Sequence, residues 1–323
     1  MDFRKTDPAL PLHLRYRLPY YFADIPEHKA VYFQWNFIQD YGSENFTAFT
    51  RRLFADVDSH PGWKLIVDVR YDGGGDGSKD ADVIKQIIKR DRFDRPGDLF
   101  VITGRKTFSA AVDFVGQAKQ WTSAIFVGEP PGAGPNAYGD PQEMTAPNLK
   151  IPFQVSTNYH MYAASTDQSD SYPPDIPAIM TAADYFSGRD PSLDMILNGT
   201  EGDLLPLPAL GVAEGGAAAK QAYEKRLVQW GTIPWWHPFS EADMNKAGYK
   251  SLDSGRAADA IVLFQMNVDR FPQSWNTWAS LGDAQRAAGE IAGAKTSYEK
   301  SLTINPGERQ PREALDEIAK TGR

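Results

Sequence analysis

The segment Thr107-Phe108-Ser109-Ala110-Ala111 carries the residue best suited to covalent chemistry. It lies between the apolar run Leu99–Thr103, which has the character of a buried strand, and a stretch with helical periodicity. A serine at a strand-to-helix corner has an exposed hydroxyl beside the first N–H groups of the helix. Those N–H groups can stabilise the oxyanion that forms when the hydroxyl attacks an acyl carbon. We therefore predict Ser109 as a nucleophile and the Ala110 N–H as an oxyanion donor. A helix N-cap role for Ser109 is the alternative, and the two roles are compatible.

A glycine-rich turn, Asp72-Gly73-Gly74-Gly75, follows the neighbouring apolar run 65–69. We expect the backbone N–H groups of Gly73 and Gly74 to supply further oxyanion donors. A phosphate-binding turn is the competing interpretation, but Asp72, Asp76 and Asp80 would repel a phosphate, and no Gly-Lys-Ser/Thr sequence follows. These aspartates also lack the alternate-residue spacing of a calcium loop. We accordingly expect no metal and no cofactor.

The composition excludes several other classes of function. The chain has 323 residues, a formal net charge of -8 and no cysteine. An acidic protein lacks the basic face that nucleic acid requires, and without cysteine there is no disulfide, thiol nucleophile or thiolate metal site. No apolar run reaches the ~18 residues of a membrane span. The sequence Met1–Asp7 has no hydrophobic core of the signal-peptide kind.

The pattern of residues 1–200 predicts an α/β domain with a largely parallel sheet, because strand-like and helix-like stretches alternate. The strand-like stretches are 30–36, 65–69, 99–103 and 124–127. The helix-like stretches are 44–59, 79–90 and 110–121. A further strand is predicted at 150–156, and the proline within it places that strand at an edge.

The composition changes after Asn198, and we predict a connector at 201–240 followed by a helical repeat region at 241–323. Residues of the same type or class recur 34 positions later at five places within this last region. The first set is Gly248, Gly255, Ala260, Phe264 and Pro272, and the second is Gly282, Gly289, Ala294, Tyr298 and Pro306. This period resembles that of the tetratricopeptide repeat, which has two antiparallel helices per unit. The region is therefore a candidate docking surface for a protein partner.

Three motifs give residues 28–190 a resemblance to the tail-specific, or carboxy-terminal processing, serine protease family. They are Val67–Gly75, Thr107–Ala111 and Val127–Gly132, and the later segments Tyr172–Ile176 and Ala183–Phe186 also fit. The resemblance implies a Clp-protease/crotonase-like fold. It also implies that Ser109 is the nucleophile, that Gly73, Gly74 and Ala110 form the oxyanion region, and that Gly132 lies in the substrate-binding region.

Two features depart from the family pattern. Gly134 occupies the place where the family's general-base lysine is expected, and Lys119 lies about 15 Å along the helix from Ser109, beyond hydrogen-bond reach. In other branches of the family, the resemblance implies an upstream histidine within a Gly-Asp-Gly-His-Thr-like segment. His13, His28 and His60 match no such segment. The remaining base candidate is His160, although an isolated histidine at a strand end is more often structural.

These observations lead to three hypotheses. The first is a serine hydrolase that cleaves peptide or related acyl bonds in a peptide or protein substrate. The second is a catalytically impaired binding module of the same fold for peptide or apolar ligands, and the third is a scaffold dominated by its repeats. The resemblance alone implies an extracytoplasmic location.

Overall fold

A computed structural model of the chain describes residues 11–15 and 18–322. Residues 1–7, from which we argued against a signal peptide, lie outside this described part. The chain divides into two compact units, residues 1–199 and 200–323. Each unit is described by itself below.

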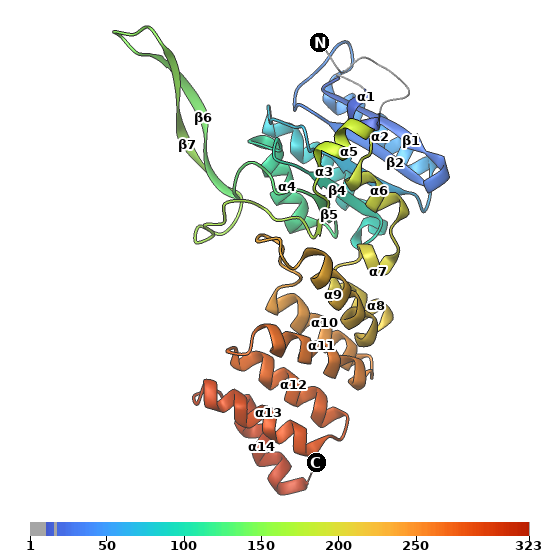
Figure 1. The fold of residues 1–323 in the computed structure, drawn as a ribbon, viewed down its shortest axis with the longest axis vertical. Helices are drawn as coiled ribbons and strands as arrows, with labels where there is room; N and C mark the ends of the chain where they lie inside the picture. The colour runs from blue at the N-terminus through green and yellow to red at the C-terminus, as the bar shows by residue number, and fades with distance from the viewer. Residues whose placement is uncertain (1–10, 16–17, 323) are drawn as a thin grey trace. The chain divides into compact units, whose positions relative to one another are not determined.

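The first unit is built around a six-stranded sheet with the strand order β1-β2-β3-β4-β5-β8 (Figure 1). β1 pairs antiparallel with β2, and every later pair is parallel. The strands span Tyr20–Ile25, Ala30–Trp35, Lys64–Asp68, Leu99–Thr103, Ile125–Gly128 and Ile176–Pro177. β2, β4 and β5 are buried along their whole length, as expected for a sheet covered on both faces.

Three crossover helices join the parallel strands: α2 (Phe46–Ser59), α3 (Asp80–Ile88) and α4 (Ala110–Trp121). Because the strands follow one another in a single direction, right-handed crossovers place all three helices on the same face of the sheet. Their apolar side chains share one core with Phe33, Val67 and Val101 of the sheet. α6 (Pro191–Asn198) packs on β4 and β5. The smaller helices of this unit are α1 (Leu12–Arg15) and α5 (Ala182–Ser187).

The strands and helices predicted around the core are confirmed to within about two residues at most ends. The prediction for 150–156 is wrong in its placement: β7 spans Pro152–Met161 and pairs with β6 (Asn136–Thr145) in a separate antiparallel hairpin. The edges of the main sheet are occupied by β1 and β8 instead. Pro152 is tolerated because it is the first residue of its strand. Figure 1 shows this hairpin as a long arm that projects from the first unit.

The second unit is entirely helical among its described residues. Its helices are α7 (Glu201–Leu204), α8 (Leu207–Glu214), α9 (Gly216–Trp230), α10 (Glu241–Asp253), α11 (Ala257–Arg270), α12 (Trp275–Ala287), α13 (Ile291–Ile304) and α14 (Gln310–Thr321). The stretch expected as a connector, 201–240, thus forms α7, α8 and α9, and these pack within this unit.

The 34-residue period of the sequence corresponds to repeated contacts between helices. A Cβ atom at Gly248 of α10 would lie 2.4 Å from Phe264 of α11. At the equivalent positions, a Cβ atom at Gly282 of α12 would lie 2.6 Å from Tyr298 of α13. Glycine in each first helix therefore lets the aromatic ring of the second helix pack directly on its backbone.

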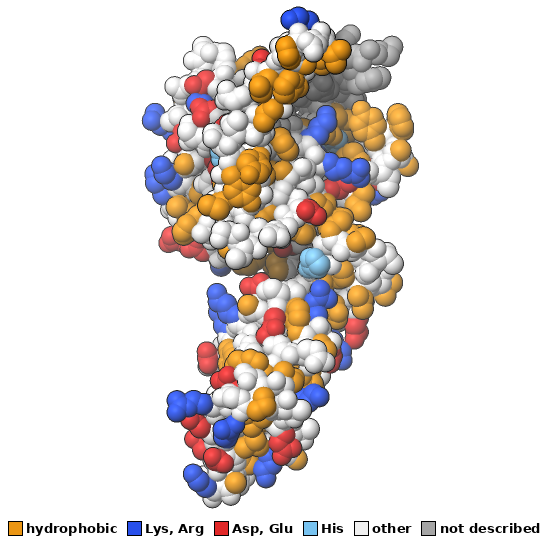
Figure 2. Space-filling model, turned by 90° about the vertical axis from the view of Figure 1, so that its left-hand side faces the viewer, with side chains coloured by type: hydrophobic (Ala, Val, Ile, Leu, Met, Phe, Trp, Pro, Cys, Tyr) orange, Lys and Arg blue, Asp and Glu red, His pale blue; other side chains and the backbone are white. Residues whose placement is uncertain are grey.

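Charged side chains of both signs are interspersed on the face of the second unit seen in Figure 2. In the described part of the chain, no helix combines the length and apolar character that a bilayer span requires.

Candidate active site

Ser109 lies at the carboxyl-end edge of the parallel sheet, in the turn between β4 and α4. Its backbone has φ 54° and ψ −128°, a conformation that non-glycine residues rarely adopt and that costs about 1–3 kcal/mol. The residue is exposed, and its hydroxyl makes no capping hydrogen bond to α4. The side chain is therefore not used as a helix cap. Instead the strained turn presents its hydroxyl to solvent.

A buried threonine fixes the turn that holds Ser109 in this conformation. Thr107 is 0% exposed, and its hydroxyl donates to the carbonyl of Val69 at 2.8 Å. The Thr107 carbonyl accepts the N–H of Gly132 at 2.9 Å, and the N–H of Phe108 donates to the carbonyl of Asp72 at 3.0 Å. The loops that follow β3, β4 and β5 are thus linked directly at this point.

The glycine turn packs tightly against Ser109. A Cβ atom at Gly74, which has φ 98°, would lie 2.7 Å from the Cβ atom of Ser109 and 2.9 Å from the carbonyl oxygen of Phe108. Only glycine permits this approach. The N–H of Gly74 donates to Oδ1 of Asp72 at 2.8 Å, so this donor already has an acceptor.

Two N–H groups of the turns that meet at Ser109 have no acceptor among the described residues. One belongs to Ala110, the first residue of α4, and the first N–H groups of a helix have no partner within it. The other belongs to Gly73, which is exposed. The N–H of Gly132, in contrast, is used by Thr107. A Cβ atom at Gly132 would lie 2.5 Å from the Arg105 carbonyl oxygen, so this glycine serves close packing.

Three carboxyl groups lie near the first turn of α4, and none of them forms an ion pair with a lysine or arginine among the described residues. Asp72 and Asp80 are both 0% exposed, and Asp113 is half-buried. Neither oxygen of Asp80 has a hydrogen-bond partner among the described residues. Oδ2 of Asp113 and Oδ2 of Asp80 lie 3.8 Å and 3.9 Å from the point where Gly77 would carry a Cβ atom.

Burial shifts the protonation of all three groups. It raises the pKa of Asp72 to about 8, against the smaller effect of the hydrogen bond from Gly74. Burial, followed by the nearby charge of Asp113, raises the pKa of Asp80 well above its ordinary value. Burial also raises the pKa of Asp113, and the hydrogen bond from Gln117 and the charge of His160 oppose that change. These carboxyls therefore favour the protonated form more than ordinary aspartates do.

His160 lies on β7 of the hairpin arm, where its Nε2 is within hydrogen-bond distance of Asp140 Oδ2 at 3.1 Å. Its ring stacks on Tyr162 at 5.7 Å between centroids. In the described part of the chain, His160 and Ser109 form no hydrogen bond with each other. The two are related through Asp113, which interacts electrostatically with His160 and lies one helical turn beyond Ser109.

The structure also explains why no lysine stands at position 134. A Cβ atom at Gly134 would lie 2.3 Å from the carbonyl oxygen of Ser169, so no side chain fits there. Lys119 instead places its ammonium group 4.2 Å from the centre of the Phe126 ring. Asp113 was not among the predicted site residues, although its spacing of four residues from Ser109 places both on one side of a helix start.

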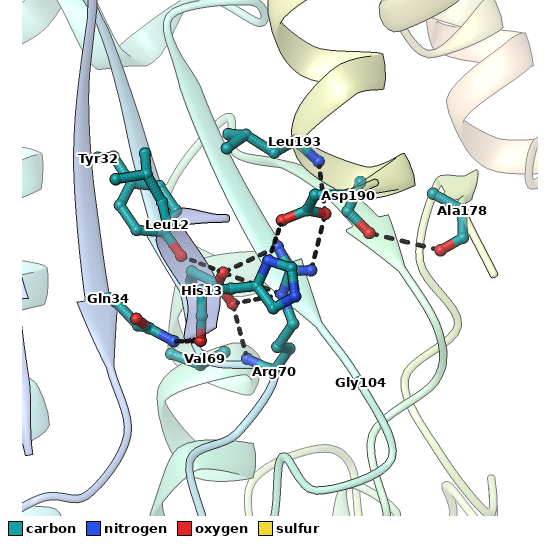
Figure 3. Close-up of polar contacts among 12 residues, drawn as sticks. Leu12, His13, Tyr32, Gln34, Val69, Arg70, Gly104, Ala178, Asp190 and Leu193 are labelled. Carbon is teal, nitrogen blue, oxygen red and sulfur yellow. Dashed lines mark hydrogen bonds and ion pairs between the residues drawn. The ribbon is translucent and has the colours of Figure 1, made fainter. Parts of the chain in front are cut away.

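A second polar cluster, in which oppositely charged groups lie side by side, flanks the other side of β3 (Figure 3). Arg70 forms ion pairs with Asp68 at 2.9 Å and with Asp190 at 2.8 Å, and His13 lies 2.7 Å from Asp190. The Tyr32 hydroxyl donates to Asp68 at 2.6 Å. Burial alone would raise the pKa of Asp190, but the charges and hydrogen bonds of Arg70 and His13 lower it overall.

One other group has the composition of a metal site. Ligand atoms of Asp24, Asp56 and His60 lie within 4.8 Å of one another, and the side chains are exposed or half-buried. Nδ1 of His60 already lies 3.0 Å from the Asp56 carbonyl oxygen and 3.1 Å from the Ser59 hydroxyl. The group is remote in sequence from the turns that form the Ser109 site.

No protein-family model matches the chain, and no curated protein does either. Among solved structures, a candidate peptidase from Parabacteroides merdae is similar, with 18% identity over 57% of this chain and 66% of its own, and a TM-score of 0.40. A candidate S41 protease from Bacteroides fragilis has 13% identity over 60% of this chain and 57% of its own, with a TM-score of 0.37.

A photosystem II D1 carboxy-terminal processing protease has 18% identity over 46% of this chain and 42% of its own, with a TM-score of 0.33. The chain thus spans less than two thirds of each of these three structures. They are peptidases or candidate peptidases by name, at identities and TM-scores too low to assign this chain a family.

Proposed function

We propose that the chain is a serine hydrolase of the processing-peptidase kind, with Ser109 as its nucleophile. The single observation that carries this proposal is the exposed serine in a strained turn, packed against Gly74 and at the start of α4, where the N–H of Ala110 has no acceptor among the described residues. Strain of this kind persists only where the surrounding structure enforces it, and it is concentrated at functional sites. The substrate class is a peptide or protein.

In the proposed reaction the Ser109 Oγ attacks the acyl carbon of the substrate, and the hydroxyl proton passes to a base. The oxyanion accepts hydrogen bonds from the N–H groups of Ala110 and Gly73. The leaving amine departs with a proton, and water then hydrolyses the acyl-enzyme in a second step through the same oxyanion site. Gly74 and Gly132 support this site by close packing.

His160 is the proposed base, and its partner Asp140 would orient the imidazole as carboxylates do in catalytic triads. Its proximity to Asp113, at the first turn of α4, supports the assignment. Replacement of His160 by Gln should lower the rate constant for hydrolysis by about 10²–10⁴-fold. Lys106→Gln, three residues before Ser109, is the matched control on the same edge of the sheet and should retain most of the activity.

The test of the proposed function is hydrolysis of a set of peptides by the wild type and by Ser109→Ala. Cleavage by the wild type that disappears in the folded Ser109→Ala variant supports the proposal. Equal cleavage by both proteins would refute it.

A second candidate function is a binding module for peptide or apolar ligands, without catalysis. The packing of Gly134 against Ser169 favours it, because that contact excludes the lysine that the resemblance leads one to expect. This candidate predicts that wild type and Ser109→Ala bind a peptide equally and that neither cleaves it.

We further propose that residues 241–323 are tetratricopeptide-like and bind a protein partner. The equivalent contacts Gly248–Phe264 and Gly282–Tyr298 support the repeat assignment. Replacing Gly282 by Leu should disrupt this packing and any partner binding. Peptide hydrolysis by the first unit serves as the internal control.

A further inference from the structure

The hairpin arm of β6 and β7 has one apolar and one polar face. The cross-strand pairs join Tyr138 to Tyr159, Gln142 to Val155 and Met144 to Phe153 on one side. Successive residues of a strand point to opposite faces, so Ala137, Glu143, Gln154, Ser156 and His160 lie on the other side. We call the first side the apolar arm face. It comprises Tyr138, Met144, Phe153, Val155, Tyr159 and Met161, with uncharged polar side chains between them.

The apolar arm face is exposed. Its side chains are between 43% and 66% exposed, and Leu149 and Ile151 at the tip are 74% and 56% exposed. The rings of Tyr138 and Tyr159 contact each other with their centroids 5.0 Å apart, so the face is ordered across its two strands. A two-stranded hairpin is marginally stable when nothing covers it, so this face requires a partner.

No charge interrupts the apolar arm face. By alternation Asp140 belongs to it, but the backbone of Asp140 has φ 49°, which departs from regular strand geometry. Its carboxylate accepts a hydrogen bond from Asn158 at 2.9 Å and pairs with His160 at 3.1 Å, and both of these residues lie on the polar face. The acidic side chain that strand alternation would place on the apolar arm face is thus turned toward the polar face.

We propose that the apolar arm face binds the same face of a second copy of this chain. The half-exposed aromatic and aliphatic side chains of the arm present on the order of 700 Å² of apolar surface on each chain. A standard stable interface buries ~800 Å² per partner, so this surface is close to the size that a dimer needs. A two-fold arrangement places like faces together, and here the like faces carry no charge. Elsewhere two copies, each with a net charge of -8, repel one another.

The charges of the arm argue against a lipid surface as the occupant. Amphipathic segments that bind membranes carry clusters of lysine and arginine, and β6, β7 and their connection contain one basic residue of this kind, Lys150. The proposed self-association does not require the proposed hydrolase activity, because Ser109 and its oxyanion donors lie outside the hairpin arm and His160 lies on its polar face.

The first test is sedimentation velocity of the full chain over a range of concentrations up to tens of micromolar. The wild type should sediment as a dimer, and Val155→Glu should raise the dimer dissociation constant by at least about tenfold, because it buries an unpaired charge. Ser156→Glu, at the neighbouring residue on the polar face opposite Pro141, is the matched control and should remain dimeric. A monomeric wild type, or equal effects of the two substitutions, would overturn the proposal.

A second test avoids any loss of folding. The chain has no cysteine, so a single introduced cysteine reports on its surroundings without interference. A two-fold axis brings residues near the middle of the ribbon close to their own copies. Thr157→Cys should form a disulfide-linked dimer under mild oxidation, and Ser156→Cys, which faces the other way, should not. Equal cross-linking of both variants, or of neither, contradicts the proposed interface.

Discussion

Two clusters of buried polar side chains flank the end of β3, and they differ in how their charges are balanced. On one side Arg70 pairs with Asp68 and Asp190, and His13 pairs with Asp190. On the other side Asp72 and Asp80 are equally buried but form no ion pair with a lysine or arginine among the described residues. The first cluster holds the carboxyl end of β3 in place through ion pairs. The second leaves carboxyls whose burial favours the protonated form, next to the strained turn of Ser109.

The difference shows where this molecule gains stability and where it carries strain. Buried charges that are paired and hydrogen-bonded are held firmly, and removal of one partner is costly. Buried carboxyls without a partner destabilise the fold when they ionise. Paired and unpaired buried carboxyls at the same end of a sheet are typical of a rigid framework that supports a functional site.

The largest effect is expected from Arg70→Met. The substitution leaves Asp68 and Asp190 buried without their cation, and it should lower the free energy of unfolding by about 3–5 kcal/mol. Urea denaturation followed by circular dichroism measures this change. The control is Arg105→Met, whose guanidinium pairs with Glu129 but is 78% exposed, and it should cost less than about 1 kcal/mol. Similar losses for both variants would show that the Arg70 cluster has no special role.

An intermediate effect is expected from Gly74→Ala. The added methyl group would lie 2.7 Å from the Ser109 Cβ atom, at a backbone φ of 98° that alanine disfavours. We expect a loss of about 1–3 kcal/mol of stability and a fall of about 10²-fold in acylation of Ser109, because the turn must shift. Gly73→Ala, where the added Cβ meets no atom within 4 Å, should be nearly neutral in stability. Equal effects at both positions would contradict the packing account.

The effect of Asp72→Asn on stability is expected to be the smallest at acidic pH and to grow as the pH rises. The pKa of Asp72 is raised from 3.8 to about 8, so between these values the unfolded chain loses a proton that the folded chain keeps. The free energy of unfolding of the wild type should therefore fall as the pH rises through this window. The Asp72→Asn variant should lose less stability over the same window, and near its upper end the two proteins should differ by at least ~1 kcal/mol. Thermal unfolding of both proteins across the window measures the difference.

Asp190 makes the opposite contribution to the pH dependence of folding stability. Its pKa is lowered overall, so its contribution is present above its unfolded pKa and is lost as the solution becomes acidic. Wild type and Asp190→Asn should therefore converge in stability at low pH, whereas wild type and Asp72→Asn should diverge at high pH. Parallel pH profiles for all three proteins would show that the two clusters do not differ.

The sequence alone predicted the elements whose signals are local. Apolar runs such as Leu99–Thr103 identified the buried strands, and the 34-residue offset identified the equivalence of Gly248 and Gly282. The hairpin arm was missed in part because Gly139 and Pro141 interrupt the strand pattern of β6.

The rest of the site depends on contacts between residues that are distant in the sequence. Arg70 and Asp190 are 120 positions apart, and no local pattern joins them. The positive φ of Ser109 and the lack of partners for Asp80 likewise arise from the packing of neighbouring loops. Such features follow from tertiary structure and carry no periodic signal.

The most direct test of the central claim is labelling with a serine-directed fluorophosphonate, followed by mass spectrometry of the modified peptide. We predict a single adduct on Ser109 in the folded wild type and none in Ser109→Ala or in heat-denatured protein. A folded wild type that remains unlabelled, or an adduct that maps to another residue and persists in Ser109→Ala, would contradict the assignment of Ser109 as nucleophile.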